Sequence, residues 1–288
     1  MKHSLLQVFI IVLLLGTNFK LAAQNTIDDA TFEKKDIVIA DNILDSIKKE
    51  KALSMGDLII KTGKILIGTS YVAHTLENGV EERMIINLRE FDCTTFAENC
   101  LALARTAQSA TPDFDTFVKE LKSIRYRNGM INDYTSRLHY FSDWIYDNEQ
   151  KGHLKNISCE INNMPVAFPV SFMSKHPDMY KQLAGNRHLI SEIAAQEKEI
   201  SKRKQCFIPK DEISTIENQL KDGDILGITT NIGGMDIQHV ALAIRQDGRI
   251  HILHDSQKYM KVIISSETLE EYLRNNKSAT GIVVARPL

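Results

Sequence analysis

Residues 239–256, HVALAIRQDGRIHILHDS, decide the fold class of this chain. Two runs rich in Ile, Val and Leu flank Asp247-Gly248, a dipeptide that favours the tight turn of a β-hairpin. Only one helix, about Glu267–Asn275, is expected among the strands around this hairpin. The last third of the chain is therefore predicted to form an antiparallel sheet. Its expected strands are Asp224–Thr230, His239–Arg245, Arg249–Ser256, Lys261–Ile264 and Gly281–Arg286.

The part before the sheet has a helical period instead. Between Asp41 and about Asn148, apolar residues recur every three to four positions, which is typical of helices with one buried face. The stripes end with Leu138, Phe141, Trp144 and Ile145. Helices first and strands later predict the α+β class, with a helical N-terminal half packed on the C-terminal sheet. We expect one domain over 24–288, carrying an insertion at about 151–209 with a charged helical run from Asp178 to Arg203.

The first 23 residues differ from the rest. Lys2 and His3 precede the apolar run Leu5–Leu15, and Leu21-Ala22-Ala23 follows as a small-residue cleavage site. These are the three parts of a secretory signal peptide, and the run is short for a membrane span. We expect an exported protein, located in the periplasm, with no stable membrane insertion after signal removal.

The charge composition limits the classes of molecule that the protein is expected to bind. The chain has 35 basic and 37 acidic residues, so it lacks the basic excess of a nucleic-acid-binding protein. No nucleic-acid partner is expected, and a small or neutral substrate fits this balance better than a polyanion.

Four cysteines in an exported protein need an explanation, because thiols pair in oxidising compartments. Cys93 and Cys100 fall seven residues apart on one expected helix, about 10 Å along its axis and beyond disulfide reach. Cys159 and Cys206 are free to pair with each other, and the sequence does not decide whether they do.

Cys93 is the strongest candidate for chemistry. It follows Asp92, a good N-cap residue, and precedes the apolar stripe that starts at Phe96, so it falls in the first turn of a helix. The free amides and dipole of that turn stabilise a thiolate and can bind an oxyanion. A buried structural thiol explains the residue equally well on these grounds.

A nucleophilic cysteine needs a base, and His239 is the best-placed histidine. It begins an expected strand at a sheet edge, and the hairpin returns His251 and His254 towards it. Positions 251 and 254 point to opposite faces of a strand, so only one of them can orient His239. For the same reason the three histidines cannot converge on a zinc ion, and we expect no metal or organic cofactor.

These residues together resemble the NlpC superfamily of papain-like cell-wall hydrolases, and within it the N-acetylmuramoyl-L-alanine amidase-like family. The resemblance runs from about Gly68 to the C-terminus. Some motifs depart from the superfamily pattern: Ser70 stands where Pro is usual, and Asp255 stands in a motif that often reads His-Ala-Ser. The matching segments are Gly68–Ala73, Asn87–Phe96, Ile124–Arg127, Ser136–Tyr140, Gly223–Ile225, His239–Ala241 and His254–Ser256.

The resemblance implies a papain-like core with Cys93 as nucleophile, His239 as base and His254 as third residue. It also implies cleavage between the lactyl group of N-acetylmuramic acid and L-Ala, in free and anhydro-type muropeptides. The residues alone indicate a cysteine amidase or acyltransferase.

Other polar residues are candidates for binding substrate or oxyanion. Tyr71, Asp92 and Thr94 are expected near the thiol. Arg137, His139 and Tyr140 are expected on one helix, where an arginine could bind a carboxylate. Two alternatives remain open at this point: an endopeptidase that cuts the γ-D-Glu to diamino-acid bond, and a periplasmic muropeptide-binding protein with a merely buried thiol. The segment around Arg137 favours the amidase.

Overall fold

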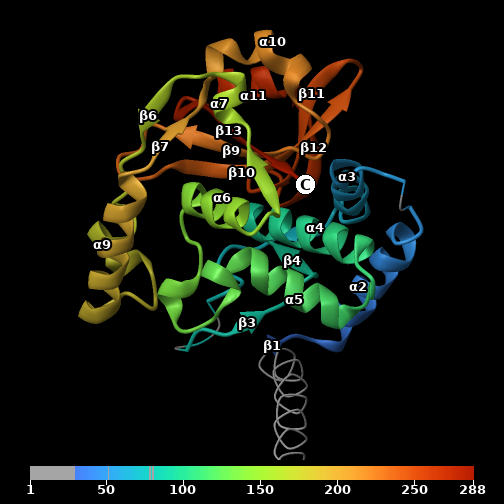
Figure 1. Ribbon diagram of the computed structural model, residues 1–288, viewed down its shortest axis with the longest axis horizontal. Helices are drawn as coiled ribbons and strands as arrows, with labels where there is room; N and C mark the ends of the chain where they lie inside the picture. Colours follow the sequence, from blue (N-terminus) through green and yellow to red (C-terminus); the bar gives the residue numbers. More distant parts are fainter. Residues whose placement is uncertain (1–29, 51, 78, 80) are drawn as a thin grey trace, which may run out of the picture.

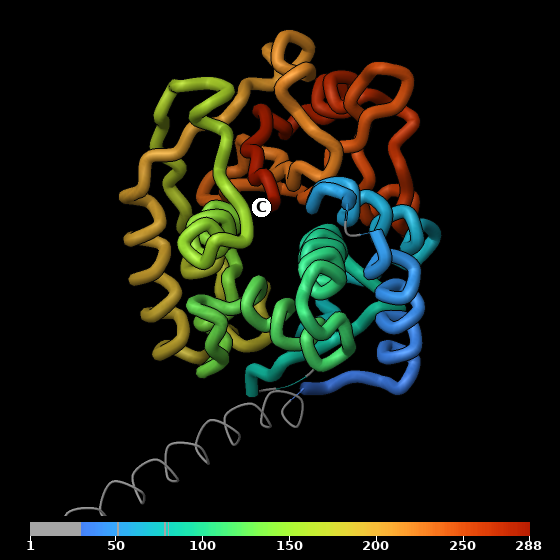
Figure 2. The backbone as a smooth tube through the Cα atoms, turned by 45° about the vertical axis from the view of Figure 1, so that its right-hand side comes forward, coloured from blue at the N-terminus to red at the C-terminus, as the bar shows by residue number. Residues whose placement is uncertain are grey.

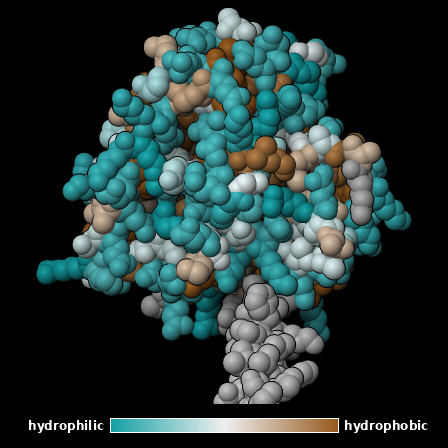
Figure 3. All heavy atoms as spheres, in the orientation of Figure 1, coloured by the Kyte–Doolittle hydropathy of each residue, from teal (hydrophilic) through white to brown (hydrophobic). Residues whose placement is uncertain are grey.

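The computed structural model of the protein describes residues 30–50, 52–77, 79 and 81–288. The predicted signal peptide lies outside these residues. Within them, no helix is long and apolar enough to cross a membrane. Figure 3 shows a face made mostly of hydrophilic side chains, with apolar atoms in small groups.

One large sheet organises the molecule, and the predicted α+β class is confirmed. Its strand order is β4-β2-β12-β11-β10-β9-β13-β5, and β8 also pairs with β13. All neighbours are antiparallel except β2 and β4, so the predicted antiparallel sheet has a parallel pair at one edge. The strands are β2 (Ser70–Tyr71), β4 (Glu90–Phe91), β5 (Leu154–Asn156), β8 (Ile208–Pro209), β9 (Ile225–Thr230), β10 (Ile237–Gln246), β11 (Arg249–Ser256), β12 (Lys261–Thr268) and β13 (Ala279–Pro287).

The predicted hairpin joins β10 to β11. Asp247 and Gly248 both have positive φ, 49° and 82°, as a type I′ turn requires. Leu242 pairs with Leu253 and Ile244 with His251, so this turn fixes which residues of the two strands face each other.

The helices of the first half cover one face of the sheet (Figures 1 and 2). α4 lies at the centre of this layer, against α3, α5 and β10, and Phe96, Cys100 and Leu101 on it have no exposed surface. Residues 30–31 and 84–85 form a separate parallel pair, β1 (Ala30–Thr31) with β3 (Met84–Ile85). The helices are α2 (Lys34–Ile47), α3 (Met55–Ile65), α4 (Cys93–Gln108), α5 (Phe114–Arg125) and α6 (Phe141–Gln150).

The other face of the sheet has a second core. Leu226, Ala241 and Ile252 pack there against Leu269 and Leu273 of α11 (Leu269–Asn275), and α10 (Ile213–Ile216) adds to this core. The central strands are thus buried on both faces, which explains why the middle of β10, Val240–Ile244, is an unbroken apolar run rather than an alternating one.

The segment 151–209, which we predict to be an insertion, is tied to the sheet at both ends, because β5 and β8 pair with β13. Its middle has a small core of its own that includes Met173, Leu183 and Ile193. Cys159 and Cys206 form a disulfide across it, which answers the question that the sequence left open. Its elements are α7 (Ser158–Ile161), β6 (Pro165–Ala167), α8 (Phe172–Lys175), α9 (Arg187–Ser201) and β7 (Lys204–Cys206).

Three local predictions are wrong. The fourth helix begins at Phe141, so Arg137, His139 and Tyr140 precede it in an extended segment. The helix in the charged run begins at Arg187, after Pro177 starts a short 3-10 turn. His239 is not on an edge strand, because β10 lies between β9 and β11 and starts two residues earlier, at Ile237.

Candidate active site

Cys93 is the first residue of α4. Asp92 caps the helix: its carboxylate accepts from the Thr95 N–H at 2.8 Å, and the Thr95 hydroxyl in turn accepts from the Asp92 N–H. This reciprocal cap holds the first turn rigidly, with the thiol half-buried and its sulfur 4.0 Å from the Thr94 hydroxyl. The backbone N–H of Val240, on β10, donates to the sulfur.

His239 and His254 form a pair on neighbouring strands. His239 Nε2 lies 2.6 Å from His254 Nδ1, and the two rings are perpendicular. His251 faces away from this pair, and its Nδ1 is 3.0 Å from the Ser265 carbonyl. The structure therefore brings His254, and not His251, to the candidate base.

Tyr272 of α11 completes the packing of the two histidines. Its ring is stacked 6.4 Å from that of His239 and stands edge-on to that of His254 at 5.7 Å. Burial, and next the negative charge that Cys93 would carry, raise the pKa of Tyr272 to about 12. Sequence analysis missed this residue, because nothing in a short helical run indicates that it faces histidines on a distant hairpin.

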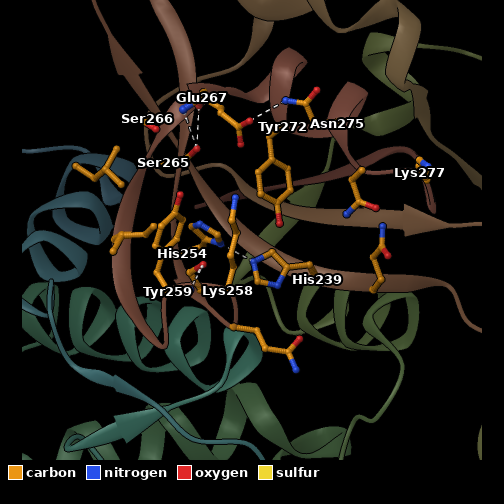
Figure 4. Close-up of a pocket in the computed structure, with 16 residues that line it drawn as sticks. His239, His254, Lys258, Tyr259, Ser265, Ser266, Glu267, Tyr272, Asn275 and Lys277 are labelled. Atoms are coloured by element: carbon orange, nitrogen blue, oxygen red, sulfur yellow. Dashed lines mark hydrogen bonds between the residues drawn. The ribbon is translucent and has the colours of Figure 1, made fainter.

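Two hollows meet at His239. A cavity of about 210 Å³ is lined by Cys93, Thr94 and His239, and a larger cleft of about 690 Å³ is lined by His239, His254 and Tyr272 (Figure 4). Gln238 and His239 are the residues common to the two linings. A substrate bond held beside Cys93 and His239 would thus have one half in each hollow.

The cavity is largely aromatic. Phe141 and Trp144 of α6 stack with centroids 5.3 Å apart, and the insertion closes the cavity with Phe172, Met173 and Tyr180. The contribution of the insertion was missed, because its residues follow a proline-rich segment with no clear period.

His139 and Tyr140 line the cavity as well. His139 Nε2 is 2.7 Å from the Tyr134 carbonyl, and burial lowers its pKa to about 3, so its ring is neutral. The Tyr140 hydroxyl donates to Glu197 at 2.7 Å and accepts from the Met173 N–H, so Tyr140 offers mainly its ring.

The protonation state of Cys93 differs from the thiolate that its position in the first turn of α4 suggests. Burial first, and then the Asp92 carboxylate, raise the pKa of Cys93 to about 12, although the Val240 N–H lowers it. Burial lowers the pKa of His239 to about 3 and that of His254 to about 4. At neutral pH the resting site therefore holds a protonated thiol and two neutral imidazoles, and the thiol needs a base to react.

Tyr71 lies on β2, next to β4 and the nucleophile. Burial raises its pKa to about 12, and the negative charge that Cys93 would carry as a thiolate and that of Asp92 add to this. Its hydroxyl thus stays protonated and remains a donor close to the sulfur.

Arg137 is placed differently from what the sequence led us to expect. Its guanidinium binds both oxygens of Glu82 at 2.9 and 2.7 Å and reaches Glu77 at 2.9 Å. The Arg137 and Glu82 side chains are 8% and 4% exposed, and Arg137 lies outside both linings. This buried ion pair anchors the segment that carries His139 and Tyr140, which is a structural role.

We expect Arg137→Ala to lower the free energy of unfolding by about 3–5 kcal/mol, because the buried Glu82 carboxylate would keep the Tyr126 hydroxyl as a donor but lose the cation that balances its charge. Chemical denaturation measures this loss. Arg83→Ala is the control, since its pair with Glu81 is 64% and 79% exposed and should contribute at most about 1 kcal/mol. A stable Arg137→Ala enzyme with a raised Michaelis constant would contradict the structural role and restore the substrate-binding one.

Asp255 is a buried acid without a partner. It has no exposed surface, and neither carboxyl oxygen has a hydrogen-bond partner among the described residues. Burial, and next the Asp92 charge, raise its pKa to about 7. The sequence marked Asp255 as a departure from its motif but gave it no role.

Asp255→Asn should stabilise the protein at high pH. The unfolded state ionises Asp255 near pH 4, whereas the folded state holds the proton to about pH 7, so the wild type loses stability as pH rises between these values. Because one pKa unit corresponds to about 1.4 kcal/mol, the gain from Asn is expected to grow over pH 4–7 by up to about 4 kcal/mol and then level off. Denaturant titrations at pH 5 and pH 8 test this, and an equal gain at both values would show that the raised pKa is not responsible.

The geometry can be compared with known proteins. Residues 61–282 match the N-acetylmuramoyl-L-alanine amidase-like family. The chain belongs to this family. The amidase-like family implies a substrate derived from peptidoglycan, and no curated protein matches the chain.

Solved structures agree with this membership. An N-acetylmuramoyl-L-alanine amidase from Bacteroides uniformis is 35% identical over 81% of this chain and 99% of its own, with a TM-score of 0.78. A protein of Legionella pneumophila at 22% identity, covering 87% of this chain and 96% of its own with a TM-score of 0.63, shows the shared fold.

A Bacteroides fragilis structure described provisionally as a xylanase is 39% identical over 78% of this amidase-like chain and 98% of its own, with a TM-score of 0.75. Glycoside hydrolysis takes two carboxyl groups flanking the bond. Among the described residues, Glu267 is the one carboxylate that lines the cleft and Asp236 the one that lines the cavity, so neither hollow holds such a pair by itself.

Proposed function

We propose that this amidase-like protein is an exported cysteine amidase that hydrolyses the bond between N-acetylmuramic acid and L-Ala in free and anhydro-type muropeptides. The observation that carries the proposal is the position of Cys93, at the start of α4, on the same cavity as His239 with His254 behind it. A papain-like, NlpC-type core is the architecture that we assign to this arrangement.

The histidine pair decides how His239 acts. When its Nε2–H donates to His254 Nδ1, its own Nδ1 keeps a free lone pair for the Cys93 proton. In the opposite tautomer Nδ1 would carry the proton, so His239 could not accept the Cys93 proton there. His254 thus selects the reactive tautomer and stabilises the imidazolium that forms, as the third member of a catalytic triad does.

Acylation then follows from the chemistry of the pair. Cys93 passes its proton to His239 as its sulfur attacks the lactyl carbonyl and forms a C–S bond. The intermediate collapses, the C–N bond breaks, and the imidazolium gives its proton to the leaving nitrogen of L-Ala. The muramyl part stays on the enzyme as a thioester.

The oxyanion of the intermediate needs donors. Because Asp92 caps the N–H of Thr95, we assign this role to the amides of Cys93 and Thr94, which precede it in the same turn, together with the Tyr71 hydroxyl. Water attacks the thioester next, His239 takes its proton, the C–S bond breaks, and the sulfur recovers the proton.

Export is part of the proposal. The Cys159–Cys206 disulfide supports it, because such bonds persist in oxidising compartments. The signal-like N-terminus points the same way, and we place the protein in the periplasm.

A pair of substrates tests the reaction class: an anhydromuramyl tripeptide and the same tripeptide without the sugar. The mature protein should release peptide from the first and leave the second intact. Ready cleavage of the sugar-free peptide at an internal bond would contradict the amidase and indicate the endopeptidase.

A further inference from the structure

The two hollows at His239 differ in which catalytic residue they expose, and this gives the site a direction. Cys93 lines the cavity and is absent from the lining of the cleft, whereas His254 lines only the cleft. The acyl group stays bonded to Cys93 after the first step, so it must occupy the cavity. The leaving amine takes its proton from His239 and departs, so it must extend into the cleft.

The linings match these two halves. The cavity is small and aromatic, which suits one sugar ring with its apolar face and N-acetyl group. The cleft has more than three times the volume of the cavity. It is lined by hydroxyl, amide and charged side chains, such as Ser265, Asn276 and Lys258. Such a lining suits a peptide with several backbone amides and carboxylates.

Two lysines give the cleft a positive character. Lys258 follows β11, Lys277 follows α11, and neither forms an ion pair with a described residue. Arg249 and Arg274, which do not line the cleft, both form ion pairs with Glu270. The Glu267 carboxylate in the cleft is held by the Asn275 amide at 2.7 Å. The two lysines are thus available for a ligand.

Lys258 lies on the side of the catalytic residues. In Figure 4 it extends between His254 and Tyr272, whereas Lys277 lies clearly apart from both histidines. Its ammonium is 5.2 Å from the centroid of the Tyr259 ring, a contact that orients the side chain.

We infer that the cleft binds the leaving stem peptide and that Lys258 recognises the free α-carboxylate of its second residue, γ-linked D-Glu. Lys277 is placed to meet a carboxylate further along the peptide. The inference rests on the proposed function, because it assumes that the peptide is the leaving group. It makes the charge of the stem peptide a determinant of specificity.

The test compares two muramyl tripeptides that differ only in that carboxylate, free in one and a primary amide in the other. The wild type should cleave the free acid with a kcat/KM at least about five-fold higher, mostly through KM. Lys258→Gln should remove this preference by slowing the acid substrate alone. Lys261→Gln, an exposed lysine of β12 outside the cleft lining, is the matched control and should keep it.

The outcomes separate the two claims. If the wild type cleaves both substrates equally at the lactyl bond, or if Lys258→Gln slows both equally, the role of Lys258 is wrong and the proposed function stands. If the wild type cleaves neither substrate, or cuts another bond, the proposed function falls and the inference falls with it.

Discussion

Replacing Cys93 by serine is expected to lower the turnover number by about 10⁴-fold or more, with no loss of fold. Removing a nucleophile that acts as a unit with its base typically costs this much or more. A serine hydroxyl is far harder for a neutral His239 to deprotonate, and the thiol packs at the edge of the core, where a smaller oxygen changes little. Thermal unfolding should therefore show a stability change within about 1 kcal/mol.

Cys100→Ala is the matched control for this variant. Cys100 is the other free cysteine, two turns along the same helix, and it is fully buried in the core. Its replacement should lower stability and leave kinetics unchanged, the reverse of the Cys93→Ser result. A Cys93→Ser enzyme with more than a few per cent of wild-type turnover would contradict the nucleophile assignment.

His239→Ala is expected to be as damaging as Cys93→Ser, because without the base the thiol stays protonated, with a pKa near 12. His254→Ala should be milder, since it removes the group that orients the base but keeps the base itself. Steady-state turnover on one muropeptide ranks Cys93→Ser, His239→Ala and His254→Ala by their loss of activity. Circular dichroism checks that each variant is folded.

His251→Ala serves as control on the same strand, because its ring faces away from His239 and contacts the Ser265 carbonyl. It should retain wild-type turnover. If His251→Ala lowered turnover and His254→Ala did not, the third catalytic residue would be His251, on the opposite face of β11.

The hairpin and the helix start were predictable because their signals are local. Asp247-Gly248 sets a turn whose register follows from backbone sterics, and Asp92 before Cys93 places the thiol in a first helical turn. The alternation of side chains along a strand predicted that only one of His251 and His254 could face His239, but it did not decide which one. These features depend on neighbours a few residues away, which a sequence displays directly.

Arg137 shows where sequence reasoning failed. Its spacing to Tyr140 and Trp144 fits a helix. The ion pair with Glu82, the β-bridge to Tyr126 and the hydrogen bond from the next N–H, that of Leu138, to the Arg125 carbonyl hold the segment extended instead. Those partners are distant in the chain. The aromatic wall that the insertion contributes, through Phe172 and Tyr180, depends on packing between segments in the same way.

The central claim is the identity of the bond that is broken, and mass spectrometry of a digest tests it most directly. Incubation of the mature protein with an anhydromuramyl tripeptide should yield two products, anhydro-N-acetylmuramic acid and a tripeptide with a free L-Ala amino terminus. Neither product should form with Cys93→Ser. A product in which the sugar still carries L-Ala and D-Glu would contradict the account.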